Sequence, residues 1–367
     1  MPAFEGAKSA TTLYGIDAMN LDMTKLEPLL GTIVNELGAA ANASLVLTGE
    51  RLGLWRALAE GGPLTSAELA ATTGTWERYV REWLASQACS GFVTYDAATD
   101  RFSLSPEQAA VFADEDSPVS MTGGFHSLAA VYDARLKLED AFRNGHGIRW
   151  GDHCNCLFCG VERFYRPGYK ANLIAAWLPA LDGVVDKLER GAKVADVGCG
   201  HGASTILMAE AFPNSEFVGV DFHEESISHA REHANSLPNV RFETGRARDF
   251  AGSGFDLVAM FDALHDMGDP VGAVAHARNV LKPDGALMLV EPMAGDSLTD
   301  NLNPVGRVYY AFSTAVCVPT SLSQEVGAGL GAQAGEKRLA EVVREGGFTR
   351  FRRAAETPFN LILEARP

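Results

Sequence analysis

The stretch that decides the fold is Lys193-Val194-Ala195-Asp196-Val197-Gly198-Cys199-Gly200-His201-Gly202-Ala203-Ser204. An apolar run ends in an acid, three glycines follow at alternate positions, and residues 205–210 are helix-forming. This order predicts a strand, a tight loop and a helix, which together open a βαβ unit. Glycines in such a loop let the backbone approach a ligand closely, because they carry no Cβ.

The spacing Gly-x-Gly-x-Gly differs from the Gly-x-Gly-x-x-Gly of nicotinamide and flavin folds, which are the main alternative. Together with the acid two residues before the first glycine, it resembles motif I of the class I methyltransferases, which bind S-adenosylmethionine (SAM). The resemblance implies that Asp196, Gly198, Gly200 and Gly202 line the methionine side of a SAM site.

Further strands are predicted at 216–221, 240–243, 255–261 and 286–291, with helices at 226–235 and 271–280. Such alternation indicates an α/β fold with a doubly wound sheet. The last two predicted strands, 349–354 and 360–365, have no helix between them, which matches the reversed last strand of the Rossmann-like, seven-stranded class I methyltransferase sheet. The predicted SAM-binding domain is 166–367, with residues 293–335 inserted as a lid or pocket wall.

The second strand ends in Asp221, where a carboxylate can accept hydrogen bonds from both ribose hydroxyls, and Phe222 beside it can pack on adenine. Many class I methyltransferases place an acid after the third strand to accept from the adenine amine, but Arg246 stands here. Adenine is then held by the backbone of Arg246 and Ala247, or by Asp249. Phe261, at the end of the fourth strand, completes the predicted cofactor set.

The segment Phe261-Asp262-Ala263-Leu264-His265-Asp266-Met267 follows that fourth strand directly. It resembles the Leu-His-Asp-Trp stretch of winged-helix O-methyltransferases, with Met267 in place of the tryptophan. In that family the histidine is the general base, which implies this role for His265, and Glu291 matches an acid that orients the imidazole. A neutral imidazole, with a pKa near about 6.5, can take the proton of a phenol whose pKa is about 10. Alternatively, His265 merely caps the segment before Asp266.

Residues 1–24 are predicted to form an N-terminal arm, and 25–115 an α-helical winged-helix domain. The stretch from residue 25 to about residue 59 is predicted to be mostly helical. Further helices are predicted at 66–72 and 76–88 and strands at 92–95 and 101–104, and Thr65 and Glu68 form a capping box. In the second helix of the pair, Arg78 and Arg81 are offset by Glu77 and Glu82, so we expect dimerisation rather than DNA binding.

The net charge of −16 also disfavours nucleic-acid binding. No transmembrane run of sufficient length and no signal peptide is seen in the sequence, and six cysteines are too few for a disulfide scaffold. We therefore expect a cytoplasmic homodimer without membrane association.

Residues 116–165 are predicted as linking helices and a cysteine-containing turn. The turn holds His153, Cys154, Cys156 and Cys159, whose spacing is poor for zinc, so structural cysteines are favoured and no metal is expected. Six aromatic residues are candidates for the acceptor pocket, although each is also compatible with ordinary core packing: Phe164, Tyr165, Tyr169, Tyr309, Tyr310 and Phe312.

The whole layout resembles bacterial class I methyltransferases with an N-terminal winged-helix dimerisation domain, including uncharacterised mycobacterial methyltransferases of this build. It implies methyl transfer from SAM to a small-molecule acceptor, at a hydroxyl, with S-adenosylhomocysteine (SAH) as product. N-, C- or S-methylation fits the same layout. A SAM-sensing winged-helix regulator is the rival from another class.

Overall fold

The computed structural model describes residues 21–234 and 237–367 of the chain. These residues form two compact units, one ending at Ser105 and the other running from Pro106 to Pro367. The boundary therefore lies before the end of the predicted 25–115 range, and the segment 116–165 belongs to the second unit. Most of the predicted arm, residues 1–20, lies outside the described residues.

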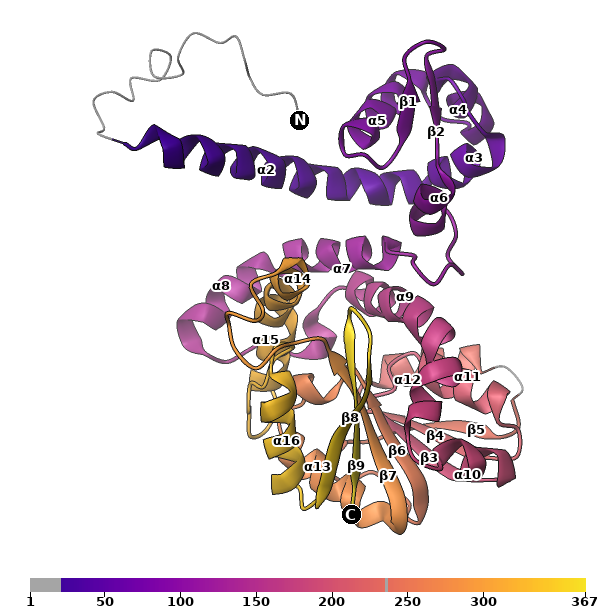
Figure 1. The fold of residues 1–367 in the computed structure, drawn as a ribbon, viewed down its shortest axis with the longest axis vertical. Coiled ribbons are helices and arrows are strands. Elements are labelled where there is room, and N and C mark those ends of the chain that lie inside the picture. Colours follow the sequence, from indigo (N-terminus) through magenta and orange to yellow (C-terminus); the bar gives the residue numbers. More distant parts are fainter. Residues whose placement is uncertain (1–20, 235–236) are drawn as a thin grey trace. The chain divides into compact units, whose positions relative to one another are not determined.

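The first unit contains helices followed by a short hairpin (Figure 1). Its elements are α2 (Met23–Arg51), α3 (Leu54–Gly61), α4 (Ser66–Thr73), α5 (Glu77–Cys89), β1 (Thr94–Asp96) and β2 (Arg101–Ser103). The stretch 25–59 is mostly helical, as predicted, and it is divided into α2 and α3 because the chain turns at Gly53, which has a left-handed φ of 71°. Glycine adopts that conformation without the steric cost that a Cβ imposes.

Packing in the first unit centres on Trp55 of α3 and Trp83 of α5, whose rings meet edge to face with centroids 4.7 Å apart. The predicted capping box of Thr65 and Glu68 is present at the start of α4. Helices α4 and α5 pack against each other and precede the β1–β2 hairpin, as in a winged-helix fold.

Helix α2 carries a row of exposed apolar side chains: Leu29, Leu30, Ile33, Val34 and Leu37. By length and composition alone, this 29-residue helix meets the criteria for a membrane span. The expectation that no stretch is long and apolar enough is therefore wrong. One such helix is weak evidence for a membrane protein, since apolar helices that meet partners in soluble proteins meet the same criteria.

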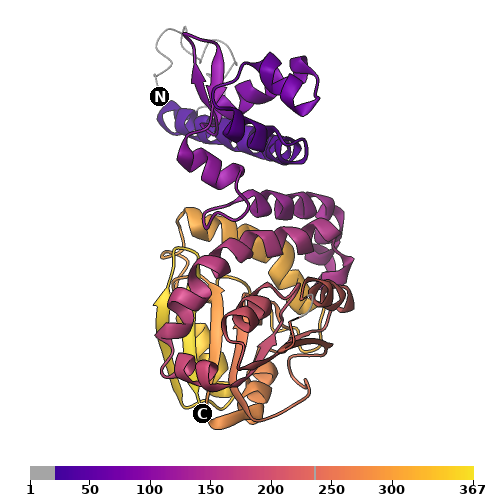
Figure 2. The same cartoon turned by 90° about the vertical axis from the view of Figure 1, so that its right-hand side faces the viewer.

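The second unit contains a seven-stranded sheet with helices on both faces (Figures 1 and 2). Its strands are β3 (Lys193–Val197), β4 (Glu216–Asp221), β5 (Val240–Thr244), β6 (Phe255–Phe261), β7 (Leu281–Pro292), β8 (Arg350–Glu356) and β9 (Asn360–Arg366). Its principal helices are α6 (Pro106–Phe112), α7 (Thr122–Asp133), α8 (Arg135–Asn144), α9 (Asn155–Asn172), α10 (Val184–Arg190), α11 (Ala203–Ala211), α12 (Glu224–His233), α13 (Pro270–Val280), α14 (Pro304–Phe312), α15 (Val318–Leu322) and α16 (Gly335–Glu345).

The strand order is β5-β4-β3-β6-β7-β9-β8. Strands β3 to β7 pair in parallel, whereas β9 is antiparallel to both β7 and β8. This arrangement confirms the predicted α/β fold and the reversed last strand. Chain order reverses direction between β3 and β6, and the carboxyl ends of these two strands are where ligands bind in open α/β sheets.

Alternate residues of the strands face the two helical layers. On one face, Ala195 and Met260 pack with α13 and α16, and on the other, Val194 and Phe261 pack with α9, α10 and α11. Strands buried on both faces are near-continuous apolar runs, as the sequence of β6 is.

The sequence predicts a helix over 168–181, after the segment that ends at Pro167, but helix α9 begins at Asn155. Pro167 and Gly168 lie within this helix, and Cys154 is its N-cap. The inserted segment 293–335 contains α14, a π-helical turn at Ser313–Cys317 and α15.

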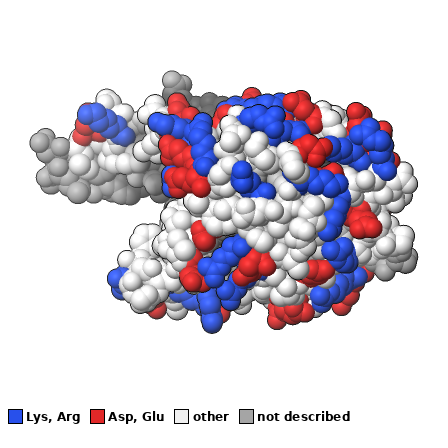
Figure 3. All heavy atoms as spheres, turned by 90° about the horizontal axis from the view of Figure 1, so that it is seen from below, with Lys and Arg blue, Asp and Glu red and all other residues white. Residues whose placement is uncertain are grey.

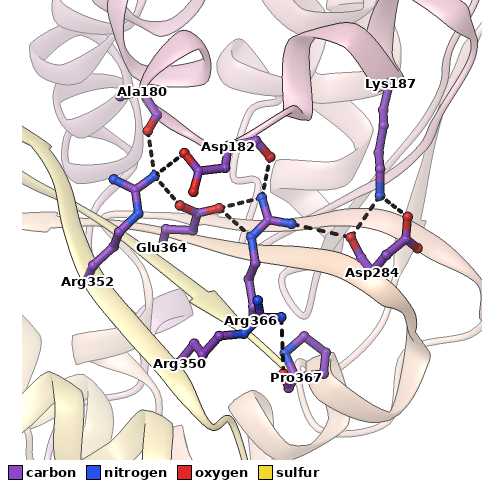
Figure 4. A network of polar contacts seen from close by, with 9 residues as sticks. All are labelled: Ala180, Asp182, Lys187, Asp284, Arg350, Arg352, Glu364, Arg366 and Pro367. Carbon is purple, nitrogen blue, oxygen red and sulfur yellow. Dashed lines mark hydrogen bonds and ion pairs between the residues drawn. The ribbon is translucent and has the colours of Figure 1, made fainter.

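Away from the carboxyl ends of the strands, an ionic network fastens β8 and β9 to the segment before α10 (Figure 4). Glu364, buried in β9, is paired with Arg352 and Arg366, and Arg352 also donates to the Ala180 carbonyl at 2.9 Å. Lys187 of α10 binds Asp284 at 2.6 Å.

Candidate active site

A cavity of about 1530 Å³ lies within the second unit at the carboxyl ends of β3, β4 and β6. Its walls come from the glycine loop, the segments after β4, β5 and β6, helices α7 and α9, and the inserted segment around α14. The cavity exceeds the range of about 300–1,000 Å³ that is usual for ligand sites, so there is room for more than one ligand.

The three glycines of the loop have distinct structural roles. Gly198 and Gly200 line the cavity, with φ values of 79° and 53°, and a Cβ on Gly198 would lie 2.7 Å from the Ala263 Cβ. Gly202, with φ 82°, is not among the lining residues, and a Cβ there would lie 2.7 Å from the Phe242 ring. Gly202 therefore lets α11 approach β5, and the other two form the ligand-facing surface.

Asp196 is fully buried at the end of β3 and does not line the cavity. Its Oδ2 accepts hydrogen bonds from the Ser204 and Thr205 hydroxyls, each at 2.6 Å, which fixes the start of α11. Its Oδ1 has no hydrogen-bond partner, and burial raises the pKa of this carboxyl to about 6. One carboxylate oxygen of Asp196 therefore fixes the start of α11, while the other accepts no hydrogen bond.

Asp221, at the end of β4, lines the cavity and is buried. Its Oδ2 accepts from the Gly200 backbone N–H and its Oδ1 from that of His223, both at 2.9 Å. Burial raises the pKa of Asp221, against the effect of these bonds. The adjacent Phe222 also lines the cavity, and its side chain is about half exposed.

The segment after β5 contributes Gly245, Arg246, Ala247 and Arg248 to the cavity wall, whereas Asp249 is not among the lining residues. The backbone N–H of Gly245 binds the Asp221 carbonyl at 2.9 Å. Of the two open alternatives for adenine, the backbone of Arg246 and Ala247 is the one that the cavity reaches.

His265 and Glu291 form a buried pair below the cavity. His265 follows β6, lines the cavity and is 3% exposed, and its Nδ1 lies 2.6 Å from Oε2 of Glu291 on β7. The other oxygen, Oε1, accepts the Leu264 backbone N–H at 3.1 Å, so Glu291 is held at both ends. This pairing fixes the ring orientation and leaves Nε2 on the other side of the ring.

On that side, Nε2 of His265 lies 3.2 Å from Oδ1 of Asp266, an oxygen that has no hydrogen-bond partner. A ring nitrogen, this carboxylate and the Cys317 thiol lie within 4.8 Å of one another. Burial lowers the pKa of His265, but Asp266 and Glu291 outweigh it and raise that pKa well above 6.5. The expectation that no metal takes part stays a prediction.

All six predicted acceptor-pocket aromatics line the cavity: Phe164, Tyr165, Tyr169, Tyr309, Tyr310 and Phe312. The first three come from α9 and the others from α14. Tyr165 and Tyr169 lie nearly parallel, with ring centroids 6.0 Å apart. Phe261 also lines the cavity and contacts Tyr169 at 5.5 Å between ring centroids.

Sequence reasoning missed several lining groups. One is Asp262, which lines the cavity and lies inside the quoted Phe261–Met267 motif, and this position is the signal that could have marked it. The apolar contribution of α7 and the start of α9 was also missed, and it comes from Met121, Phe125, Leu128, Leu157, Phe158 and Val161. No local motif marks those residues, because their role depends on the packing of α7 against α9.

The cysteine turn holds a disulfide between Cys154 and Cys156 at the start of α9. Cys159 is a free, exposed thiol, and the buried His153 has no hydrogen-bond partner at either ring nitrogen. The disulfide uses two of the thiols that a zinc site in this turn would need, and the expectation that no metal binds here stays a prediction. The disulfide itself was not foreseen.

The strand order and the glycine-lined cavity define a class I methyltransferase fold, here preceded by a winged-helix unit. Residues 188–345 match the family model of a methyltransferase domain, and residues 40–113 match that of an Rv2258c-like winged HTH domain. The chain therefore carries a methyltransferase domain.

Similar proteins include the ubiquinone biosynthesis O-methyltransferase of Neisseria meningitidis, 36% identical over 114 residues that make up 29% of this chain and 46% of that protein. The chain matches less than half the length of the curated relatives. The mitomycin 7-O-methyltransferase MmcR has a similar fold, with a TM-score of 0.67, 20% identity and coverage of 94% of this chain and 100% of that one. Human N-acetylserotonin methyltransferase in complex with SAM gives a TM-score of 0.67 at 18% identity, with coverage of 95% and 98%.

Proposed function

We propose that this protein is a SAM-dependent methyltransferase that methylates a hydroxyl of a small, largely apolar acceptor. The observation that carries the proposal is the His265–Glu291 pair, with 2.6 Å between Nδ1 and Oε2, in which His265 lines the same cavity as the glycine loop. A donor site and an oriented base thus share one enclosure.

The residues present fit SAM. Gly198 and Gly200 line the cavity, and Gly200 has open space beside it, so these two residues would border the methionine portion. Asp196, which does not line the cavity, fixes the start of α11 through Ser204 and Thr205. Each Asp221 oxygen already accepts one backbone N–H and retains lone pairs for ribose hydroxyls. Phe222 and the backbone of Arg246 and Ala247 flank the space for adenine. When bound, SAM supplies an electrophilic methyl group on a sulfonium.

The protein's task is to place the acceptor in line with that methyl group and to take its proton. Glu291 holds the imidazole at Nδ1, so that Nε2 can accept the hydroxyl proton as charge develops on the oxygen. Asp266 and Glu291 stabilise the imidazolium that results. The apolar walls exclude water, which favours transfer to the acceptor over hydrolysis.

The acceptor side supports an apolar, partly aromatic substrate. Aromatic side chains from α9 and α14 line the cavity together with aliphatic and aromatic residues of α7. Three of the structural neighbours are named for acceptors of this kind or for the natural products to which they belong: mitomycin, N-acetylserotonin and pyocyanin. An N-, C- or S-methyltransferase would use the same donor site without needing a base of this kind.

Calorimetric titration with SAM and SAH tests the donor site, and binding with micromolar affinity is the expected result. Incubation with methyl-labelled SAM and a panel of phenols, aliphatic alcohols, amines and thiols then tests the acceptor class by mass spectrometry. The proposal fails if neither ligand binds, or if only amines, thiols or carbon nucleophiles are methylated.

The first unit supports a role in homodimerisation. The exposed apolar row on α2 is unusual for a soluble surface unless a partner covers it. On α5, Arg78 pairs with Glu82 at 2.6 Å and Arg81 with Glu77 at 2.8 Å, so these arginines are neutralised rather than presented to phosphates. On the face seen in Figure 3, acidic and basic side chains are intermingled.

We therefore favour a cytoplasmic dimer that binds neither nucleic acid nor membrane. Light scattering on the purified chain tests this. A monomer, or recovery of the protein in the membrane fraction, would contradict it. The SAM-sensing regulator remains the second candidate, because residues 40–113 match a winged HTH model. Binding of DNA by the protein that changes when SAM is added would favour the regulator.

A further inference from the structure

Asp262 occupies an unusual position in the cavity. It follows the last residue of β6 directly, and its backbone has a left-handed φ of 49°, which few residues other than glycine adopt. Its backbone N–H donates to the Val290 carbonyl of β7 at 2.7 Å, so the strained turn is anchored. Backbone conformations of this kind tend to occur at functional positions.

The Asp262 carboxylate is held at both oxygens. The Tyr169 hydroxyl donates to Oδ2 at 2.8 Å, and the Asn360 side-chain amide donates to Oδ1 at 3.0 Å. These donors come from α9 and β9, on two different parts of the unit. The carboxylate is therefore fixed in direction rather than free to rotate.

Three tyrosine side chains of the cavity wall lie near this carboxylate. Tyr165 stacks on Tyr169, and Tyr309 is buried with its hydroxyl bound to the Phe359 carbonyl at 2.8 Å. Burial raises the pKa values of Tyr165, Tyr169 and Tyr309, and the nearby Asp262 charge raises each further. All three therefore lie within electrostatic range of the same carboxylate.

A fixed carboxylate bordered by aromatic rings is the arrangement that recognises a poorly hydrated cation, because both ring faces and carboxylate attract positive charge. Burial, and then repulsion from Glu291, raise the pKa of Asp262 to about 8, while Tyr169 and His265 oppose this rise. A positive charge beside Asp262 lowers the pKa of its carboxyl and so favours the ionised form.

The location selects the cation. Ala263, the next residue, lies against Gly198 of the glycine loop, and His265 follows two positions later. Asp262 thus stands between the proposed methionine site and the proposed base, where the reacting sulfur must lie. We propose that Asp262 and the rings of Tyr165, Tyr169 and Tyr309 form a sulfonium-recognition subsite, which favours SAM over the neutral product SAH. This inference rests on the proposed function.

Calorimetric titration of the full chain with SAM and SAH, in wild type and Asp262→Asn, tests the subsite. Asparagine tolerates left-handed backbone nearly as well as aspartate, so the variant should fold. We expect its SAM affinity to fall about tenfold or more, with SAH affinity changed by less than about threefold. Tyr165→Leu should also lower the affinity for SAM relative to the affinity for SAH. Asp221→Asn is the matched control, since a lost ribose contact weakens both ligands equally.

The outcomes separate the two proposals. If the wild type binds neither ligand, the SAM-dependent function fails and the subsite with it. If the wild type binds both but Asp262→Asn keeps the wild-type ratio, the sulfonium subsite alone is overturned. If Asp262→Asn raises only the KM of a cationic acceptor and leaves the ratio of SAM affinity to SAH affinity unchanged, the subsite binds the acceptor instead. The sulfonium assignment is then equally overturned.

Discussion

Nδ1 of His265 and Oε2 of Glu291 lie 2.6 Å apart, and both side chains are almost completely buried. The pair joins the segment after β6 to the neighbouring strand β7, so the base is positioned by the sheet itself rather than by a loop.

His265→Ala should lower kcat by about 10²–10⁴-fold, the usual contribution of a general base, with little effect on the affinity for SAM. Single-turnover methylation of an identified acceptor measures the first effect and calorimetry the second. Wild-type turnover in this variant would mean that His265 only shapes the cavity.

Glu291→Gln should also lower kcat, because the amide neither stabilises an imidazolium nor fixes the ring tautomer as a carboxylate does. Unfolding in urea should accompany the kinetics, since Glu291 also accepts the Leu264 N–H. A loss of kcat much greater than the loss of stability explains would identify positioning of the base. If Glu291→Gln lowers kcat by the same factor in a His265→Ala background, Glu291 does not act by positioning His265.

The pH profile follows from the raised pKa of His265. A protonated imidazole cannot act as a base, so a raised pKa moves the active, neutral form of His265 toward higher pH. We therefore expect kcat/KM to rise with pH through a group whose pKa exceeds 6.5, and this limb should vanish in His265→Ala. The same shift stabilises the fold at low pH, and that contribution is lost as pH rises through the folded-state pKa. A profile that is flat between about pH 6 and pH 9 in the wild type would refute the assignment.

Gly202→Ala tests the close approach of α11 to β5. The new Cβ would meet the Phe242 ring and require a left-handed φ, so we expect a loss of about 2–4 kcal/mol in the free energy of unfolding. Gly200→Ala is the matched control, because no atom lies within 4 Å of its added Cβ although φ is also positive. If both variants lose the same stability, the backbone conformation alone accounts for the effect.

Glu364→Ala should remove the acid shared by Arg352 and Arg366 and leave cationic groups without their buried partner (Figure 4). Breaking a buried pair from one side costs about 3–5 kcal/mol, and here somewhat less is expected because Arg352 is partly exposed. Affinity for SAM should be unchanged, since the network lies away from the cavity.

The central strands β3 and β4 were predictable, because each is an apolar run with an acid at or next to its end, Asp196 or Asp221. The place of Asp221 in the cavity wall follows from its position at a strand end, whereas Asp196 does not line the cavity. The start of α9 was not predictable, because Pro167 within a helix has the same local sequence signal as a proline that begins one. The Cys154–Cys156 disulfide and the contacts of Asp262 depend on tertiary packing, for which a single sequence carries no periodic pattern.

The hydrogen bonds that Asp221 accepts from the backbone N–H groups of Gly200 and His223 have a consequence for the rate of ligand binding. They hold the glycine loop in its curved form before any nucleoside arrives, so little conformational entropy remains to be lost on binding. Association should therefore be fast and follow a single phase, because the loop is preorganised and needs no slow closing step.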